Sequence, residues 1–172
     1  MATHVLIQTV TVGSGGAASI AFTSIPQTYT DLLMVMSIRT NNNSVADYAS
    51  ISFNSSTSSF SLRTLYGTSS AAGSTTYTTS PDSLIVGQVV GNTATASVFS
   101  SGSIYIPNYT SNINKSYSTD AARENNTIAN EMALSSGVWS NTAAITSITL
   151  TSWAGATLLQ YSSASLYGIS KT

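Results

Sequence analysis

The stretch of sequence that decides the fold is Leu32-Leu33-Met34-Val35-Met36-Ser37-Ile38. It is apolar at nearly every position, which is typical of a β-strand covered on both faces. Periodicity alone is compatible with a helix, but seven residues are few for one. Pro26 places a turn upstream, because proline cannot donate to a central ladder, and residues 41–44 form the loop that follows.

Outward from this stretch, short apolar or alternating runs recur between Gly, Asn, Ser and Pro residues. Upstream, runs 5–12 and 19–23 flank the turn Gly13-Ser14-Gly15-Gly16, which predicts a hairpin between them. The downstream runs that predict strands are 48–53, 60–66, 83–90, 98–106, 115–121, 145–153, 157–161 and 164–169.

Three segments of the chain are less regular. Residues 68–81 are low in complexity and are expected to form a long loop with one exposed strand around 75–79. Residues 115–121 are weakly apolar and are a candidate partner for 98–106. Residues 125–139 fit either a long strand or a short helical turn.

About ten strands at spacings of roughly 8 to 15 residues, with almost no helix, predict a sandwich or a barrel. We expect an all-β fold in which residues 1–172 form a single-domain antiparallel β-sandwich of jelly-roll type. At this length the chain can bury a sizeable core without a metal or a disulfide, and cysteine is absent.

The composition is unusual in its charge. Asp, Glu, Lys and Arg make up 6% of the chain, against about 25% in an average soluble protein, and Ser and Thr account for about a third of the residues. The mean hydropathy is +0.16 and the net charge is −1, which favours collapse over disorder. An almost neutral surface lacks one defence against self-association, so we expect the protein to act inside an assembly.

The charge pattern and the start of the chain also bear on partners and location. The five basic residues are scattered and form no patch, so we expect no nucleic-acid partner. No run approaches the ~20 apolar residues of a membrane span, and the first residues lack the pattern of a signal peptide. We therefore expect a soluble product made in the cytoplasm, with no membrane partner.

Residues that could carry chemistry are few, and we expect no enzyme, no catalytic residue and no cofactor. His4 is the only histidine, so the serines lack a base to activate them. Glycoside hydrolysis needs two carboxylates, whereas Asp31, Asp47 and Asp82 are expected at strand ends. The remaining acids are Asp120, Glu124 and Glu131.

Acids and amides cluster at residues 120–126, which offer oxygen atoms for calcium but lack the pattern of a calcium loop. A solvated turn in which Arg123 offsets the acids is the favoured interpretation. No His/Cys spacing suits zinc, so no metal site is predicted. Four aromatic residues in apolar runs are expected to close the core rather than bind a ligand: Tyr66, Trp139, Trp153 and Tyr167.

Several motifs resemble a family of small virion structural proteins, capsid-associated or fibre-like, of tailed bacteriophages, including cyanophages. They are the opening 7–22, the segment 24–32, Phe53-Asn54, Leu65-Tyr66-Gly67, the segment 139–148 and Leu166-Tyr167-Gly168-Ile169. The resemblance spans nearly the whole chain but carries over no catalytic residue. It implies a virion location and many copies on a symmetric particle.

Two functions follow from this resemblance as expectations. The favoured one is a capsid decoration (cement) protein that stabilises the shell through contacts with other virion proteins, chiefly the major capsid protein, as a homotrimer. The alternative is a tail or baseplate fibre adhesin that binds a host surface glycan through loops 41–44 and 108–114. A polysaccharide depolymerase is the third hypothesis and has the least support, because the chain is short and poor in acids.

Overall fold

The structure is a computed structural model and describes residues 3–78, 84–125 and 130–170. Within these ranges the chain forms twelve β-strands and no α-helix. The strands are β1 (Thr3–Thr11), β2 (Ser19–Phe22), β3 (Asp31–Ile38), β4 (Ala46–Phe53), β5 (Phe60–Thr68), β6 (Ala72–Tyr77), β7 (Ile85–Val90), β8 (Ser100–Ile106), β9 (Lys115–Arg123), β10 (Glu131–Trp139), β11 (Ile148–Ser152) and β12 (Ser163–Ser170).

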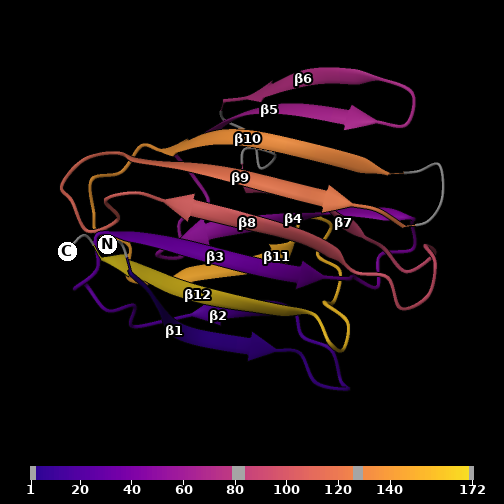
Figure 1. Cartoon of the computed structure of the whole chain (residues 1–172), viewed down its shortest axis with the longest axis horizontal. Coiled ribbons are helices and arrows are strands. Elements are labelled where there is room, and N and C mark those ends of the chain that lie inside the picture. The colour runs from indigo at the N-terminus through magenta and orange to yellow at the C-terminus, as the bar shows by residue number, and fades with distance from the viewer. Residues whose placement is uncertain (1–2, 79–83, 126–129, 171–172) are drawn as a thin grey trace.

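The strands form two sheets that pack face to face, so the predicted all-β antiparallel sandwich is confirmed. The large sheet has eight strands in the order β1-β12-β3-β8-β9-β10-β5-β6, and the small sheet has four in the order β2-β11-β4-β7. All neighbouring strands are antiparallel. Figure 1 shows the large sheet face on, from β6 at the top to β1 at the bottom, with the small sheet layered against it.

Strand β3 lies where the sequence predicts it, near the middle of the large sheet, but only one of its faces is covered. Its inward side chains are buried between the sheets: Leu32, Met34, Met36 and Ile38. On the other face Val35 is 44% exposed and Leu33 is half-buried. The prediction of cover on both faces is therefore wrong within the described part of the chain, where the second apolar face meets no other layer.

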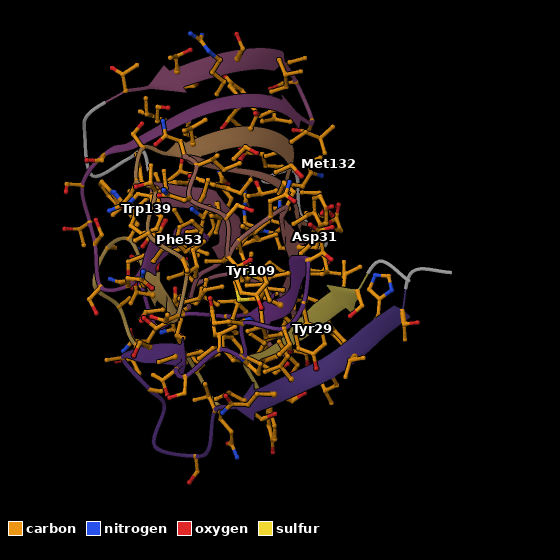
Figure 2. The ribbon with its side chains drawn as sticks, turned by 90° about the vertical axis from the view of Figure 1, so that its left-hand side faces the viewer. Tyr29, Asp31, Phe53, Tyr109, Met132 and Trp139 are labelled. Carbon is orange, nitrogen blue, oxygen red and sulfur yellow. The ribbon has the colours of Figure 1, made fainter. Side chains whose placement is uncertain are left out.

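The core is closed at one end by an aromatic cluster of Phe53, Phe60, Tyr117 and Trp139. Phe53 meets Tyr117 and Trp139 edge to face, with ring centroids 5.7 Å apart in both pairs, and Phe60 stacks on Trp139 at 6.1 Å. Such contacts stabilise a core beyond the area that they bury. Figure 2 shows Phe53 and Trp139 on the inner side of the large sheet, and Met132 on its opposite side.

The predicted core aromatics divide by position. Trp139 is buried as expected, but Trp153 is 47% exposed, so its assignment to the core is wrong. Trp153 follows the last residue of β11 and packs edge-on against Tyr48 at 6.3 Å. Tyr66 and Tyr167 are half-buried.

The predicted hairpin between residues 5–12 and 19–23 does not form. β1 pairs with β12 in the large sheet, and β2 pairs with β11 in the small sheet. The intervening segment carries the chain from one layer to the other. Gly16 adopts a φ of 71°, which glycine reaches without strain, and the amides of Ala17 and Leu158 donate to each other's carbonyl oxygens.

Several segment predictions change at their boundaries. Residues 98–106 and 115–121 pair as β8 and β9, as expected. The ambiguous stretch 125–139 contains β10 from Glu131 onward, with residues 126–129 outside the described part. The strand expected around 75–79 begins earlier, as β6, and Thr79 lies outside the described residues. No strand covers 157–161, where Leu158 makes isolated bridges to Ala17 and Thr40.

Candidate functional site

The large sheet is wider than the small one, and its excess width creates a cleft. Edge strand β7 of the small sheet packs on β9 and β10, while β5 and β6 extend the large sheet beyond β10. A cavity of about 270 Å³ lies at this step. The residues that line this cleft are Tyr48, Thr64, Tyr66, Thr75, Tyr77, Ile85, Gly87, Gln88, Glu131, Ala133 and Ser135.

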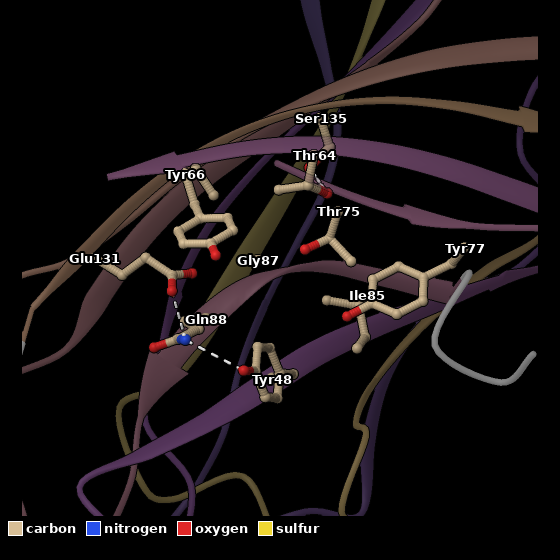
Figure 3. Close-up of a pocket in the computed structure, with 11 residues that line it drawn as sticks. Tyr48, Thr64, Tyr66, Thr75, Tyr77, Ile85, Gly87, Gln88, Glu131 and Ser135 are labelled. Atoms are coloured by element: carbon tan, nitrogen blue, oxygen red, sulfur yellow. Dashed lines mark hydrogen bonds between the residues drawn. The ribbon is translucent and has the colours of Figure 1, made fainter. Parts of the chain in front are cut away.

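A chain of hydrogen bonds fixes the polar end of the cleft, and Figure 3 shows the two that Gln88 donates. The Nε of Arg123 donates to the Oε1 of Gln88 at 2.7 Å. The Nε2 of Gln88 donates to the Oε2 of Glu131 at 2.6 Å and to the hydroxyl oxygen of Tyr48 at 3.2 Å. Because arginine only donates, the Gln88 amide must direct its oxygen toward Arg123 and its NH₂ group into the cleft.

Burial is the largest cause of the pKa shifts of Glu131 and Arg123. Desolvation raises the pKa of Glu131, and the nearby Arg123 guanidinium partly opposes that rise. Burial likewise lowers the pKa of Arg123, with Glu131 acting in the opposite direction. The two charges therefore stabilise each other less than their removal from water costs.

The walls of the cleft carry aromatic rings and hydroxyl groups. Tyr66 and Tyr77 are half-buried, and Tyr48 is 36% exposed. Gly73 on β6 leaves room for the side chain of Tyr66, since a Cβ atom at position 73 would lie 2.7 Å from the tyrosine hydroxyl oxygen. Rings with polar tips beside hydroxyl groups are suited to a ligand that has both apolar and polar edges.

The predicted acids do not converge on this cleft. Asp31 accepts hydrogen bonds from the hydroxyl of Tyr105 and the amide of Asn108, and buried Asp47 accepts one from Ser152. Asp82 lies outside the described residues. Glu131 is the one acid among the described residues that line the cleft, and the described part of the chain contains no group of three potential metal ligands.

Residues 120–125 do not form the predicted solvated turn, and residue 126 of that segment lies outside the described part of the chain. Asp120 and Arg123 belong to β9, whose inward residues alternate from Lys115 to Arg123, and Arg123 is buried. Asp120 lies on the opposite side of the strand, where it accepts a hydrogen bond from the hydroxyl of Ser103. His4 is exposed near the start of β1.

The two loops expected to bind a glycan lie at opposite ends of the sandwich. Loop 41–44 follows the end of β3, next to the start of β8, because Ile38 pairs with Ser100. Loop 108–114 follows the end of β8, next to the start of β3, because Leu32 pairs with Ile106. The two loops therefore cannot form one site, and neither contributes a residue to the cleft.

A second surface stands out on the side of the large sheet that faces away from the small sheet, called here the outer face. Its larger apolar side chains are Leu6, Leu33, Val35, Leu65, Tyr105, Met132, Leu134 and Tyr167. Met132, Leu65 and Leu134 are 71%, 64% and 62% exposed. Leu65 is directly opposite Leu134, and Leu6, Tyr167, Leu33 and Tyr105 form one cross-strand row.

Most of the basic side chains point inward. Arg39 and Lys115 are 6% and 1% exposed. Arg39 donates four hydrogen bonds to carbonyl oxygens between residues 92 and 98. Lys115 donates three to the carbonyl oxygens of Ser111, Ile113 and Thr142, and burial lowers its pKa.

With Arg123 also buried, the described part of the chain exposes one of the five basic residues, Arg63. Lys171 lies outside the described residues. The surface is therefore less charged than the composition indicates.

Comparison with known protein-family models finds no match, and comparison with curated proteins finds none either. The resemblance to virion structural proteins thus rests on the sequence motifs quoted above. Among the described residues, no helix is long and apolar enough to cross a membrane.

Proposed function

We propose that this chain is a capsid decoration protein of a tailed bacteriophage, which stabilises the shell through protein–protein contacts. The observation that carries the proposal is the outer face. Six of its apolar side chains are at least 36% exposed: Leu6, Val35, Leu65, Tyr105, Met132 and Leu134. They form two groups, on β1-β12-β3-β8 and on β10-β5, with Asp120 of β9 between them. Large exposed apolar areas on one face of a sheet are typical of an interaction site.

The sequence of strand β3 also indicates that the outer face is covered by another protein. Its residues are apolar on both sides, as in a strand covered on both faces, but the described chain covers only the side that carries Met34 and leaves Val35 exposed. A neighbouring protein on the particle would supply the missing cover. The scarcity of exposed charge favours this contact, because few ions lose water when the surface is buried.

We also propose that the sandwich is of jelly-roll type, which is common in viral capsid domains. Eight strands support this, because β1-β12-β3-β8 face β2-β11-β4-β7, the order produced when a long hairpin of eight strands rolls up. The pairs β5-β6 and β9-β10 are then two hairpins inserted into that plan. They widen the large sheet and carry Leu65, Met132 and Leu134.

The partners in this proposal are the major capsid protein and two further copies of the chain, with the protein made in the host cytoplasm and located in the virion. The homotrimer rests on the three-fold symmetry common in such particles, and sedimentation that gives a stable monomer at high concentration would contradict it. Imaging of purified particles tests the decoration role. We expect a copy number comparable to that of the shell protein, and a copy number lower by orders of magnitude would reject the role.

The second candidate function is a tail or baseplate fibre adhesin that binds a host surface glycan. The observation that favours it is the cleft, where Tyr48, Tyr66 and Tyr77 surround a fixed polar group. A host-cell pull-down with the purified chain tests this function. Retention above that of an unrelated β-sandwich protein is expected, and retention at the background level would remove the candidate.

A further inference from the structure

We propose that the cleft between β7 and the β5-β6 hairpin binds one ring of a neutral saccharide. The inference deepens the second candidate function and rests on it for the biological source of the sugar. It does not depend on the decoration role, because the cleft opens on the inner side of the large sheet and the outer face lies on the other side.

The size of the cavity points to a small ligand. Pockets for drug-sized molecules span about 300 to 1,000 Å³, whereas this cavity measures about 270 Å³. A single sugar ring suits that volume better than an extended oligosaccharide held along its length. The neighbouring units of a longer glycan would leave through the open side of the cleft.

The aromatic walls suit a sugar ring. A pyranose has a face of C–H groups and an equator of hydroxyl groups, so it needs apolar contact on one side and hydrogen bonds around its edge. Tyr66 and Tyr77 offer half-buried ring surface from β5 and β6, and Tyr48 offers its ring and hydroxyl from β4 across the cleft (Figure 3). A tyrosine ring is stiff and amphipathic, so it provides contact at little cost in conformational entropy.

The polar groups that remain open match sugar hydroxyls. The Oε2 atom of Glu131 accepts from Gln88, and Oε1 has no hydrogen-bond partner among the described residues. The Tyr48 hydroxyl accepts from Gln88 and keeps its proton to donate. The Thr75 hydroxyl also lines the cleft. Adjacent sugar hydroxyls each donate and accept, so a carboxylate oxygen beside two hydroxyl groups is a complementary set.

The charges select against acidic sugars. Glu131 is the acid at the polar end of the cleft, and a ligand carboxylate there would meet a like charge. The Arg123 guanidinium, which would otherwise attract an anion, is 5% exposed, and its Nε is bonded to Gln88. The cleft therefore presents acceptor and hydroxyl groups without an accessible cation, which favours a neutral ligand.

Titration of the isotope-labelled full chain with glucose, galactose, mannose and glucuronic acid, followed by NMR, tests this inference. We expect at least one neutral sugar to shift the backbone amide signals of Thr75 and Gln88 in a saturable way at millimolar concentrations. Glucuronic acid is expected to bind at least about tenfold more weakly. Absence of saturable shifts for all the neutral sugars, or equal binding of the acid, would overturn the proposal.

Two adjacent threonines of β6 provide a matched pair of variants. Thr75 faces the cleft, whereas Thr76 is exposed on the other side, where its hydroxyl accepts from Arg63. Thr75→Val removes one open hydroxyl group and is expected to weaken sugar binding about three- to tenfold. Thr76→Val is expected to leave it unchanged. Equal binding by both variants would remove the cleft as the site.

The sugar titration and the host-cell pull-down together distinguish sugar binding in the cleft from adhesion to the host. A host-cell pull-down that succeeds while the titration fails would place adhesion on another surface and reject the cleft. A titration that succeeds while the pull-down fails would keep the sugar site and reject adhesion. The copy number in the particle bears on neither result.

Discussion

Replacement of the paired leucines of the outer face by serine should weaken attachment of the chain to the particle without unfolding it. Leu65 on β5 and Leu134 on β10 are direct cross-strand partners, and their side chains are 64% and 62% exposed. They therefore contribute little to the core of the free chain. Their apolar surface becomes valuable only when a neighbouring protein covers it.

The size of the effect follows from the exposed fractions. Full burial of a leucine side chain contributes about 2 kcal/mol. Scaled by exposures of 64% and 62%, each leucine contributes slightly more than about 1 kcal/mol on docking. The double variant Leu65→Ser/Leu134→Ser should thus lose about 2.5 kcal/mol of binding free energy, which raises the dissociation constant roughly 70-fold. The stability of the free chain should change by about 1 kcal/mol or less, because cross-strand pairs contribute about 0.2 to 1 kcal/mol.

The assay measures re-binding of purified chain to particles from which it has been stripped, quantified by co-sedimentation over a range of chain concentrations. Ile113→Ser is the matched control, because Ile113 is 53% exposed but lies in the loop between β8 and β9. The control should bind as the wild type does. If the double variant binds with wild-type affinity, or if Ile113→Ser weakens binding equally, the outer face is not the contact surface.

Three further predictions concern the chain itself. Arg39→Met removes the four hydrogen bonds that the buried guanidinium donates. It should lower the free energy of unfolding, measured by urea titration, by about 3 kcal/mol. The control Arg63→Met, at an exposed position, should lower it by less than about 0.5 kcal/mol, and equal losses would contradict the burial argument. Gly137→Ala places a Cβ atom 2.1 Å from the ring of Tyr117, which is 2% exposed. The overpacking should lower the free energy of unfolding by about 1 to 3 kcal/mol. An unchanged melting temperature would refute that packing. Burial raises the pKa of Glu131, so the folded state favours the protonated carboxyl, and wild-type stability falls as pH rises from the unfolded pKa through the folded one. The stability of Glu131→Gln relative to wild type should therefore increase as the pH rises above the ordinary glutamate pKa of about 4.3. A difference independent of pH would show that the carboxyl is not desolvated.

Much of the fold could be predicted from local pattern. The run around Met34 and the alternating runs near Ile51 and Ile104 are strands β3, β4 and β8. A short, nearly continuous apolar run between turn residues indicates a strand, and alternation reports burial on one face. Strand β9 carries a weaker sequence signal, since buried Lys115 and Arg123 occupy inward positions that are usually apolar. Lys115 donates to carbonyl oxygens of the preceding loop and of Thr142, and Arg123 donates to Gln88 on β7. The alternation pattern does not report these acceptors, and those at Thr142 and Gln88 are distant in the sequence.

The pairing of strands and the cleft could not be predicted from the sequence. The Gly-rich turn at Gly16 fits a hairpin locally, but the choice between pairing β1 with β2 and placing them in different sheets depends on β12 and β11. The cleft joins Tyr48, Gln88 and Glu131 from three strands with two further tyrosines. No spacing marks that set, because their proximity arises from the step between the two sheets.

Oxidation of methionine tests most directly whether the outer face of the large sheet is covered in the particle. Met132 is 71% exposed on that face, while Met34 and Met36 are 1% and 4% exposed in the core. Peroxide should oxidise Met132 rapidly in the free chain and much more slowly in intact particles, with Met34 and Met36 slow in both, as measured by peptide mass spectrometry. Oxidation of Met132 at the same rate in the free chain and in the particle would show that the outer face is not covered.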